Sequence, residues 1–186
     1  MTTSFHDHFN AHREAVERSV ESLEASTGAA SHALAEALRA GAKVLTFGNG
    51  GSSAEASHLA EELVGRFKKN RRPFPAMSLS ADSGTVTCIS NDFGYAALFE
   101  RQIEAFVQRG DVAVALTTSG TSENVIRGLR AAKSRGAITI ALTGSAGLNE
   151  TDADHVLAVP SEDSAIVQEV HLILIHLFCM AVEEIA

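Results

Sequence analysis

The sequence predicts an α/β fold in which a mostly parallel sheet is covered by helices on both faces. The first observation is that short apolar runs of strand length alternate with longer segments of helical pattern from about residue 43 onward. The second is that turns rich in Gly, Ser and Thr follow two of these runs directly. Strands that alternate with helices form parallel sheets, and such sheets bind ligands beyond the carboxyl ends of their strands. We therefore expect the functional site at that edge.

The elements expected along the chain begin with helices. Spaced apolar residues predict one helix over residues 4–26 and a second over 33–39, which ends near Gly41, a residue suited to helix C-termini. The strands expected after them are residues 44–47, 76–79, 112–116, 138–142 and 156–159. The helices expected between and after the strands cover residues 54–67, 86–89, 98–107, 123–134 and 164–185. No linker interrupts the 186 residues, so we expect one domain, with N-terminal helices at about 4–41 and an α/β core at about 43–186.

Composition limits the partners and the compartment. The 23 acidic residues outnumber the 15 basic ones, and the net charge of −8 argues against non-specific binding of nucleic acid. The N-terminus has no apolar signal core, and no stretch reaches the roughly 18 uninterrupted apolar residues of a membrane span. We expect a cytoplasmic protein without a membrane partner.

Three further groups of residues have ordinary interpretations. Cys88 and Cys179 lie among apolar neighbours, which predicts buried thiols and no disulfide. The basic run at residues 68–72 is typical of a solvated loop. The histidines that crowd the first helix predict a solvated face, with metal binding as the alternative; they are His6, His8 and His12.

Two loops share one design, in which a buried strand runs through a small hydroxyl-rich turn into a helix. They are Gly48–Ser53 and Thr117–Ser122. Backbone N–H groups at a helix N-terminus bind anions, and the hydroxyls could add donors. The alternative is that Ser and Thr only cap the helices and that Gly only permits a tight turn. No Gly-Lys-Ser/Thr triplet occurs, so a phosphosugar suits these loops better than a nucleoside triphosphate.

Polar residues on two predicted helices indicate either a metal site or proton transfer. His58 and Glu62 are four residues apart on one helix face, and Glu61, three residues from His58, is an equal candidate by spacing. Gln168 and His176 share a stripe of the very apolar last helix, where a polar group is costly unless it finds a partner. A core histidine bonded to a backbone carbonyl is the alternative for His176. Imidazole and carboxylate suit zinc, and they equally suit moving a proton between adjacent carbons.

Five blocks of the sequence resemble the phosphoheptose isomerases, a family of the sugar isomerase (SIS) superfamily. The blocks are Gly48–Ser52, His58–Arg66, Asn91–Gly94, Thr118–Val125 and Gln168–His171, and the resemblance runs in register from the first helix to the last. Any single block would indicate only an SIS domain, whereas their joint occurrence is specific. The resemblance implies a three-layer flavodoxin-like SIS fold and a homotetramer with active sites at subunit interfaces.

The resemblance also implies an activity and a site. The activity is conversion of sedoheptulose 7-phosphate to D-glycero-D-manno-heptose 7-phosphate through a cis-enediol, in heptose biosynthesis. One Zn²⁺ per active site would be held by His58, Glu62, Gln168 and His176, with Glu62 and His176 as the acid/base pair. Thr118, Ser119 and Ser122 would take the phosphate, and Asn49, Ser52 and Asp92 would face the sugar hydroxyls. The full set of implied substrate-binding positions is Asn49, Gly50, Gly51, Ser52, Asp92, Thr117, Thr118, Ser119, Ser122 and Gln168.

One departure and two other function classes remain. Many relatives carry a charged or polar pair where this chain has Ala165 and Ile166, so one sugar contact is expected to be missing. A non-catalytic SIS tetramer that partners the replication initiator protein is the main alternative. Such scaffolds tend to lose the positions of Glu62 and His176, which this chain keeps. A regulatory module that senses a sugar phosphate is disfavoured, because 186 residues leave no room for an effector domain.

Overall fold

Five parallel strands form the sheet of the computed structural model, which describes residues 4–149 and 151–185. The strands are β1 (Val44–Gly48), β2 (Ala76–Ser78), β3 (Val112–Thr117), β4 (Ile138–Thr143) and β5 (His155–Ala158). Their order is β2-β1-β3-β4-β5, the flavodoxin-like arrangement. Gly48 of β1 lies opposite Leu116 of β3, so the turns after these strands emerge side by side. The predicted fold class and the predicted strands are confirmed.

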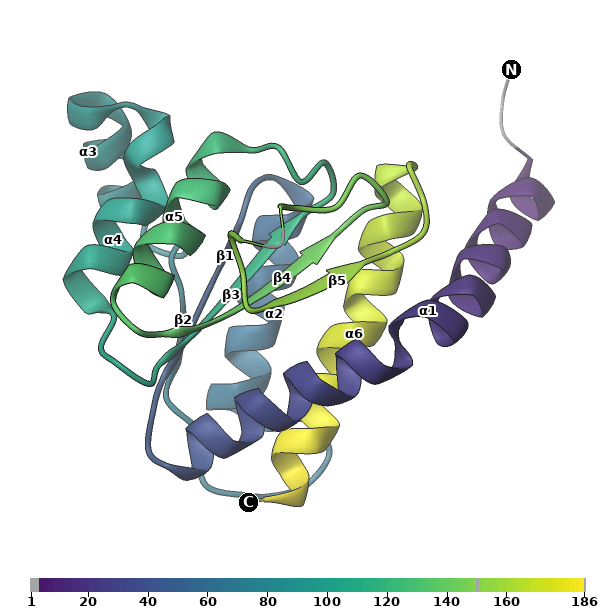
Figure 1. Cartoon of the computed structure of the whole chain (residues 1–186), viewed down its shortest axis with the longest axis horizontal. Helices are drawn as coiled ribbons and strands as arrows, with labels where there is room; N and C mark the ends of the chain where they lie inside the picture. The colour runs from purple at the N-terminus through teal and green to yellow at the C-terminus, as the bar shows by residue number, and fades with distance from the viewer. Residues whose placement is uncertain (1–3, 150, 186) are drawn as a thin grey trace.

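Helices cover both faces of the sheet (Figure 1). The described helices are α1 (Phe5–Arg39), α2 (Gly51–Val64), α3 (Ser83–Phe93), the 3₁₀ turn η1 (Tyr95–Ala97), α4 (Leu98–Phe106), α5 (Glu123–Ser134) and α6 (Ser164–Glu184). One buried cluster joins α1, α2 and α6 to one face of the sheet. A second cluster joins α4 and α5 to the opposite face. The molecule therefore has three layers.

The central strands are buried on both faces, which explains why they read as continuous apolar runs. In β3, Val112, Val114 and Leu116 belong to the cluster under α2 and α6, whereas Ala113 and Ala115 belong to the cluster under α4 and α5. The small Ala residues on the face under α4 and α5 leave room for aromatic rings. The centroids of the Phe47 and Phe99 rings lie 5.0 Å apart there.

The N-terminal region is one helix and not the two that we expected. Helix α1 runs without a break through the Ser-Thr-Gly segment that separates the two predicted helices. A capping box starts it, in which Asp7 N–H donates to the Ser4 side chain at 3.1 Å. A mid-helix glycine costs only about 1 kcal/mol relative to alanine. A continuous buried stripe, which includes Leu23, Thr27 and Leu34, offsets that cost.

Asp163 is the N-cap of α6, and its side chain accepts a hydrogen bond from Ala165 N–H at 2.9 Å. By length and composition it could cross a membrane, since its mean hydropathy is 1.9. Half of that stretch is buried inside the protein, however, and the core helix of a soluble protein passes the same test. His171 and Phe178 are among its buried residues.

Three of the smaller expectations need correction. Cys179 is buried as expected, but Cys88 is exposed, because it lies on the outer side of α3. Arg71 is not simply solvated, because its guanidinium donates to the backbone carbonyls of Glu62 and Leu63. The histidines of α1 are only partly a solvated face. His8 and His12 each bond one carboxylate oxygen of Glu169 on α6, at 2.7 and 2.6 Å.

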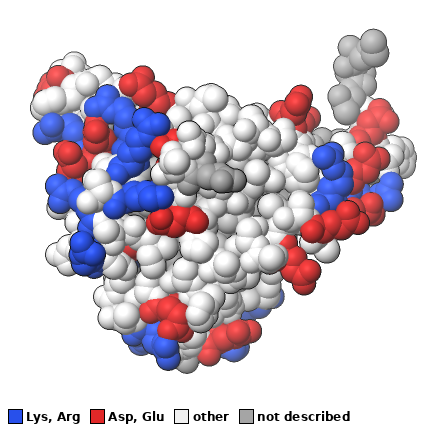
Figure 2. Space-filling model, in the orientation of Figure 1, with Lys and Arg blue, Asp and Glu red and all other residues white. Residues whose placement is uncertain are grey.

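Charged side chains of both signs are mixed on the surface over α4 and α5 (Figure 2). Ion pairs account for part of this mixture: Arg127 pairs with Glu100, and Arg130 Nε lies 2.7 Å from Asp152 Oδ1. The Arg127 pair is partly exposed, and such pairs contribute at most about 1 kcal/mol, whereas the carboxylate of the Arg130 pair is buried. The face in Figure 2 shows no continuous stripe of basic residues in its described part.

Candidate active site

The two predicted loops lie side by side at the carboxyl edge of the sheet. Gly50 is the N-cap of α2, with φ of 56°, and Ser122 is the N-cap of α5. The Ser122 side chain makes no capping hydrogen bond in the described structure, so its hydroxyl is left for another acceptor, as are the N–H groups of Glu123 and Asn124. The N–H of Val125 already donates to Asn124 Oδ1 at 3.0 Å. For Ser122, therefore, the simple capping interpretation fails. The start of α5 remains suited to an anion.

The second loop is shaped by its own hydroxyls. Thr117 Oγ1 accepts from Gly120 N–H at 3.3 Å, and Ser119 Oγ accepts from Thr121 N–H at 3.2 Å. Ser164, the first residue of α6, donates to Thr118 Oγ1 at 3.1 Å. Gly120 has φ of +68°, and an added Cβ would lie 1.9 Å from a backbone oxygen. The loop is therefore held in one conformation before any ligand binds.

A pair of side-chain amides ties the two loops together. Asn49 and Asn124 exchange two hydrogen bonds, each of 2.9 Å, and Tyr95 Oη donates to Asn49 Oδ1 at 2.7 Å. Ser52 is 3% exposed beneath the first loop. Asp92 is exposed on α3, where its carboxylate accepts from Asn91 Nδ2 at 2.7 Å. Of the three predicted sugar contacts, the structure therefore groups Asn49 and Ser52 and leaves Asp92 on a separate helix.

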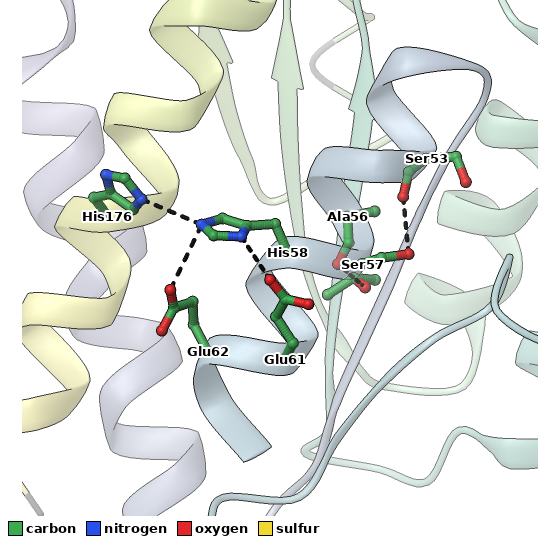
Figure 3. A network of polar contacts seen from close by, with 8 residues as sticks. Ser53, Ala56, Ser57, His58, Glu61, Glu62 and His176 are labelled. Carbon is green, nitrogen blue, oxygen red and sulfur yellow. Dashed lines mark hydrogen bonds and ion pairs between the residues drawn. The ribbon is translucent and has the colours of Figure 1, made fainter. Parts of the chain in front are cut away.

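Three of the four predicted metal ligands converge between α2 and α6 (Figure 3). His58 Nε2 lies 3.3 Å from His176 Nε2 and 3.7 Å from Glu62 Oε1. The His58 side chain is 30% exposed and that of Glu62 is 19% exposed, so the cluster is open on one side. Two imidazoles and a carboxylate thus direct their donor atoms toward one region.

The structure separates the roles of the two adjacent glutamates. Glu61 Oε1 lies 2.8 Å from His58 Nδ1, on the opposite side of the ring from Glu62. A carboxylate at one imidazole nitrogen fixes the tautomer, so that the other nitrogen can bind a metal or accept a proton. Sequence spacing could not distinguish Glu61 from Glu62. Glu62 and His176 both lie at Nε2 of His58, whereas Glu61 lies at Nδ1.

The donor atoms fit zinc in spacing, although they do not form a closed cage. Tetrahedral ligands with zinc bonds of about 2.0–2.1 Å are about 3.3–3.4 Å apart. The separation of the two imidazole nitrogens, 3.3 Å, agrees with that value. Among the described residues no three His, Cys, Asp or Glu side chains already surround a single metal position. The zinc site therefore stays a prediction.

Gln168, the fourth predicted ligand, is placed apart from this cluster. It is two turns from His176 on α6, about 12 Å of helix rise. Its amide packs against Gly51 at the start of α2, where an added Cβ would lie 2.4 Å from Gln168 Nε2. With the amide in this place, position 51 has no room for a Cβ, and a larger residue would displace the end of the Gln168 side chain. Gln168 therefore connects the first loop to α6.

Burial favours the neutral form of the His176 imidazole. Desolvation, with His58 as the second cause, lowers the pKa of His176 below its ordinary value, although Glu62 acts in the opposite direction. Neutral imidazole has a free lone pair, which is the form that binds a metal or takes a proton.

His171 is the core histidine that the sequence had left as one option for His176. It is fully buried, and its Nε2 lies 3.2 Å from the carbonyl oxygen of Thr143, which can only accept. Its Nδ1 faces Glu55 Oε2 at 3.9 Å, and neither atom has a hydrogen-bond partner among the described residues.

The fold and these loops define a class of protein before any activity is considered. A flavodoxin-like sheet with two small hydroxyl-rich loops at its carboxyl edge is the sugar isomerase architecture, and the SIS domain family model matches residues 7–144. The sequence is 53% identical to the phosphoheptose isomerase of Aquifex aeolicus over 152 residues, which cover 81% of this chain and 80% of that protein. It is 42% identical to that of Helicobacter pylori over 176 residues, 94% of this chain and 92% of the relative.

Two solved structures agree with these relatives. The phosphoheptose isomerase of Francisella tularensis has a TM-score of 0.90 and 32% identity, and the match covers 96% of each chain. That of Neisseria gonorrhoeae has a TM-score of 0.87 and 36% identity, and the match covers 95% of each chain. The chain belongs to the phosphoheptose isomerase family, and it is an isomerase.

Sequence reasoning missed several residues that support the site. Tyr95 and Asn124 hold Asn49, and Phe67 lies against His176, with ring centroids 5.0 Å apart. Asn124 and Phe67 lie within or beside the quoted sequence blocks, but nothing in their spacing indicates these contacts. The contacts depend on how distant elements pack.

Proposed function

We propose that the protein interconverts sedoheptulose 7-phosphate and D-glycero-D-manno-heptose 7-phosphate through a cis-enediol, in heptose biosynthesis. The observation that carries the proposal is the convergence of His58, Glu62 and His176 beside the two small-residue loops, in a chain of this family. The scaffold alternative is not favoured, because the relatives that match this chain at high identity are named as isomerases.

Two proton transfers are required, and two residues suit them. The carboxylate of Glu62 takes the proton from C1 of the open-chain ketose, which gives the enediol, and returns it to C2. His176, as neutral imidazole, moves the other proton from the C1 hydroxyl to the oxygen on C2. General acid–base catalysis of this kind typically accelerates a reaction by about 10²–10⁴-fold.

The phosphate is proposed to lie at the start of α5. Thr118, Ser119 and Ser122 surround that helix start, and the unused capping position of Ser122 supports an anion there. Asn49, Ser52 and Asp92 are the proposed partners of the sugar hydroxyls. Asp92 lies in the last turn of its helix, three residues before Tyr95, which donates to Asn49.

Zinc is the proposed cofactor, held by His58, Glu62 and His176 with Gln168 as the fourth ligand. When bound, it would polarise the carbonyl and hydroxyl oxygens of the substrate. The 3.3 Å separation of the imidazole nitrogens supports this assignment. Gln168 would have to leave part of its contact with Gly51 to join them.

A homotetramer with active sites at subunit interfaces, in the cytoplasm, completes the proposal. Support for assembly comes from the outer face of α1 and α6, where several apolar side chains are exposed. They are Val20, Leu172, Ile173, Leu177 and Met180. Four of these side chains, all except Leu172, border a hollow of about 510 Å³ between the two helices. Exposed apolar surface of this extent is typical of a protein–protein contact.

Isotope exchange tests the role of Glu62 directly. In D₂O the wild-type protein should incorporate deuterium at C1 of the ketose and C2 of the aldose, followed by NMR. Glu62→Gln should lower this exchange at least 100-fold, because glutamine cannot take a carbon-bound proton. His176→Gln should also lower net isomerisation, but by impairing the oxygen transfer. Exchange in Glu62→Gln at a near wild-type rate would remove Glu62 from the carbon step.

A further inference from the structure

A short segment links the two helices that carry the cluster. After α2 the chain runs through Gly65–Arg72, which we call the strap, before it reaches β2. The strap is fixed at both ends. Arg71 donates to the carbonyls of Glu62 and Leu63 at 2.6 and 2.9 Å, and so it satisfies the C-terminal turn of α2.

The other anchor of the strap is on α6. Glu183 is 5% exposed, and its Oε1 accepts from the backbone N–H groups of Lys68 and Lys69 at 2.8 and 2.9 Å. Hydrogen bonds to an ionised carboxylate are stronger than those between neutral groups. The strap therefore ties the end of α2 to the end of α6.

Directly before the Glu183 anchor, the strap presents the ring of Phe67 to the cluster. The Phe67 and His176 ring centroids lie 5.0 Å apart with an interplanar angle of 31°. Lys68 Nζ lies 5.0 Å from the centroid of the Phe67 ring. Phe67 is half-buried and packs on the cluster that includes α2 and α6. It thus contacts the His176 ring, while His58 Nε2 approaches His176 Nε2.

The orientation of His176 needs such a contact. The outer side-chain torsion of histidine is broad, so packing has to select the ring plane. Among the described residues His176 has no hydrogen-bond partner other than His58. Stacked aromatic pairs gain stability beyond that of the area they bury, and the gain depends on ring geometry. Phe67 is therefore the neighbour best placed to set which way Nε2 points.

We propose that Phe67 is a positioning residue for His176, and that the Arg71 and Glu183 anchors of the strap hold Phe67 in place. The role rests on the proposed function insofar as His176 binds zinc and moves a proton. Its structural part, the stacking that orients the imidazole, does not depend on that function. Residues that support a metal ligand typically change metal affinity or activity by about 10–100-fold when they are replaced.

Four variants test the proposal. Phe67→Leu removes the ring, and Phe67→Tyr keeps it. Glu183→Ala frees the strap without touching the ring, and it serves if Phe67→Leu fails to fold. Phe106→Leu is the matched control, because Phe106 is an exposed ring at the end of α4 in the opposite layer. Thermal melting of each variant confirms that it is folded.

Three readouts are needed, namely kcat and KM with sedoheptulose 7-phosphate, zinc affinity by competition with a chelator, and the NMR shifts of the His176 ring protons in metal-free protein. We expect Phe67→Leu to lower kcat about tenfold with KM within twofold, to weaken zinc binding about tenfold, and to abolish the ring-current shift. Phe67→Tyr and Phe106→Leu should match the wild type. Glu183→Ala should change kcat, the zinc affinity and the ring-current shift in the same direction as Phe67→Leu, but by a smaller amount.

The outcomes separate this proposal from the proposed function. If the wild type lacks turnover but shows the ring-current shift and loses it in Phe67→Leu, the isomerase assignment fails and the stacking role stands. If Phe67→Leu binds zinc and turns over like Phe67→Tyr, the positioning role is wrong even when the isomerase assignment holds. A metal-free wild type without the ring-current shift would also overturn it.

Discussion

Glu55 and His171 are buried opposite each other on α2 and α6. Burial raises the pKa of Glu55 to about 8 and lowers the pKa of His171 to about 4. Both groups are therefore neutral near pH 6. A protonated Glu55 can donate to His171 Nδ1, since His171 Nε2 is committed to the Thr143 carbonyl. A small rotation would close the 3.9 Å separation between Glu55 Oε2 and His171 Nδ1.

The two groups have opposite effects on stability. Glu55 has a raised folded pKa, so its contribution is complete below pH 4.5 and is lost as the pH rises toward 8. His171 has a lowered folded pKa, so its contribution is complete above pH 6.5 and is lost as the pH falls toward 4. The effects offset each other between pH 4.5 and 6.5. The free energy of unfolding should therefore decline from pH 6.5 to 8 because of Glu55 alone.

Urea unfolding of the metal-free protein between pH 5.5 and 8.5 measures this decline. In Glu55→Gln the decline between pH 6.5 and 8 should be reduced, because the amide does not ionise. Glu104→Gln, on α4 in the opposite layer, is the control and should keep the wild-type slope. A wild type and a Glu55→Gln variant with the same slope would contradict the raised pKa of Glu55.

For single residues, the sequence predicted which side chains belong to the site better than it predicted their contacts. His58, Glu62 and His176 could be selected from helical spacing and resemblance, and the structure brings them together. The sequence could not show that His171, and not His176, is the histidine bonded to a backbone carbonyl. Both lie on the same apolar helix. Which one faces the sheet depends on the packing of α6 against β4, a long-range property.

At the scale of elements, the contact between α2 and α6 depends on a glycine. Gly51→Ala should push the Gln168 amide away, because the new Cβ would lie 2.4 Å from Nε2. We expect kcat/KM to fall about tenfold or more, since an ångström of misplacement near a site can cost that much. Steady-state kinetics with sedoheptulose 7-phosphate measures the loss.

A double-mutant cycle identifies the cause. If the Gly51→Ala defect acts through Gln168, then adding it to Gln168→Ala should cost little more, because the clashing amide is already gone. Additive effects of the two changes would show that Gly51 matters for another reason, such as the path of the first loop.

The elements themselves were largely predictable. All five strands follow from apolar runs of strand length, and the parallel sheet follows from their alternation with helices. Helix α1 was predicted as two pieces, but it continues through Ser-Thr-Gly. Its continuity comes from packing along α6, which local propensity does not report. The contacts of the strap could not be predicted either. They join Arg71 to α2 and Glu183 of α6 to the strap backbone, and they depend on how these elements pack.

At the scale of the whole molecule, α1 and α6 leave an apolar face in the single chain. Ile173 is 39% exposed at its centre, beside the hollow between the two helices. Ile173→Asp should dissociate the proposed tetramer, because it places a charge in a contact that excludes water. Sedimentation velocity measures the change, with Phe106→Asp in the opposite layer as the control. A wild type that sediments as a monomer at micromolar concentration would contradict assembly through this face.

The central claim is that this isomerase works on sedoheptulose 7-phosphate with a metal held by His58, Glu62, Gln168 and His176. Turnover of that substrate by the purified protein tests it most directly, measured as purified, after chelation, and after zinc is restored. We predict activity that is lost on chelation and regained with zinc, and not regained in His58→Ala. Zinc-loaded, folded protein that does not turn over sedoheptulose 7-phosphate would contradict the claim.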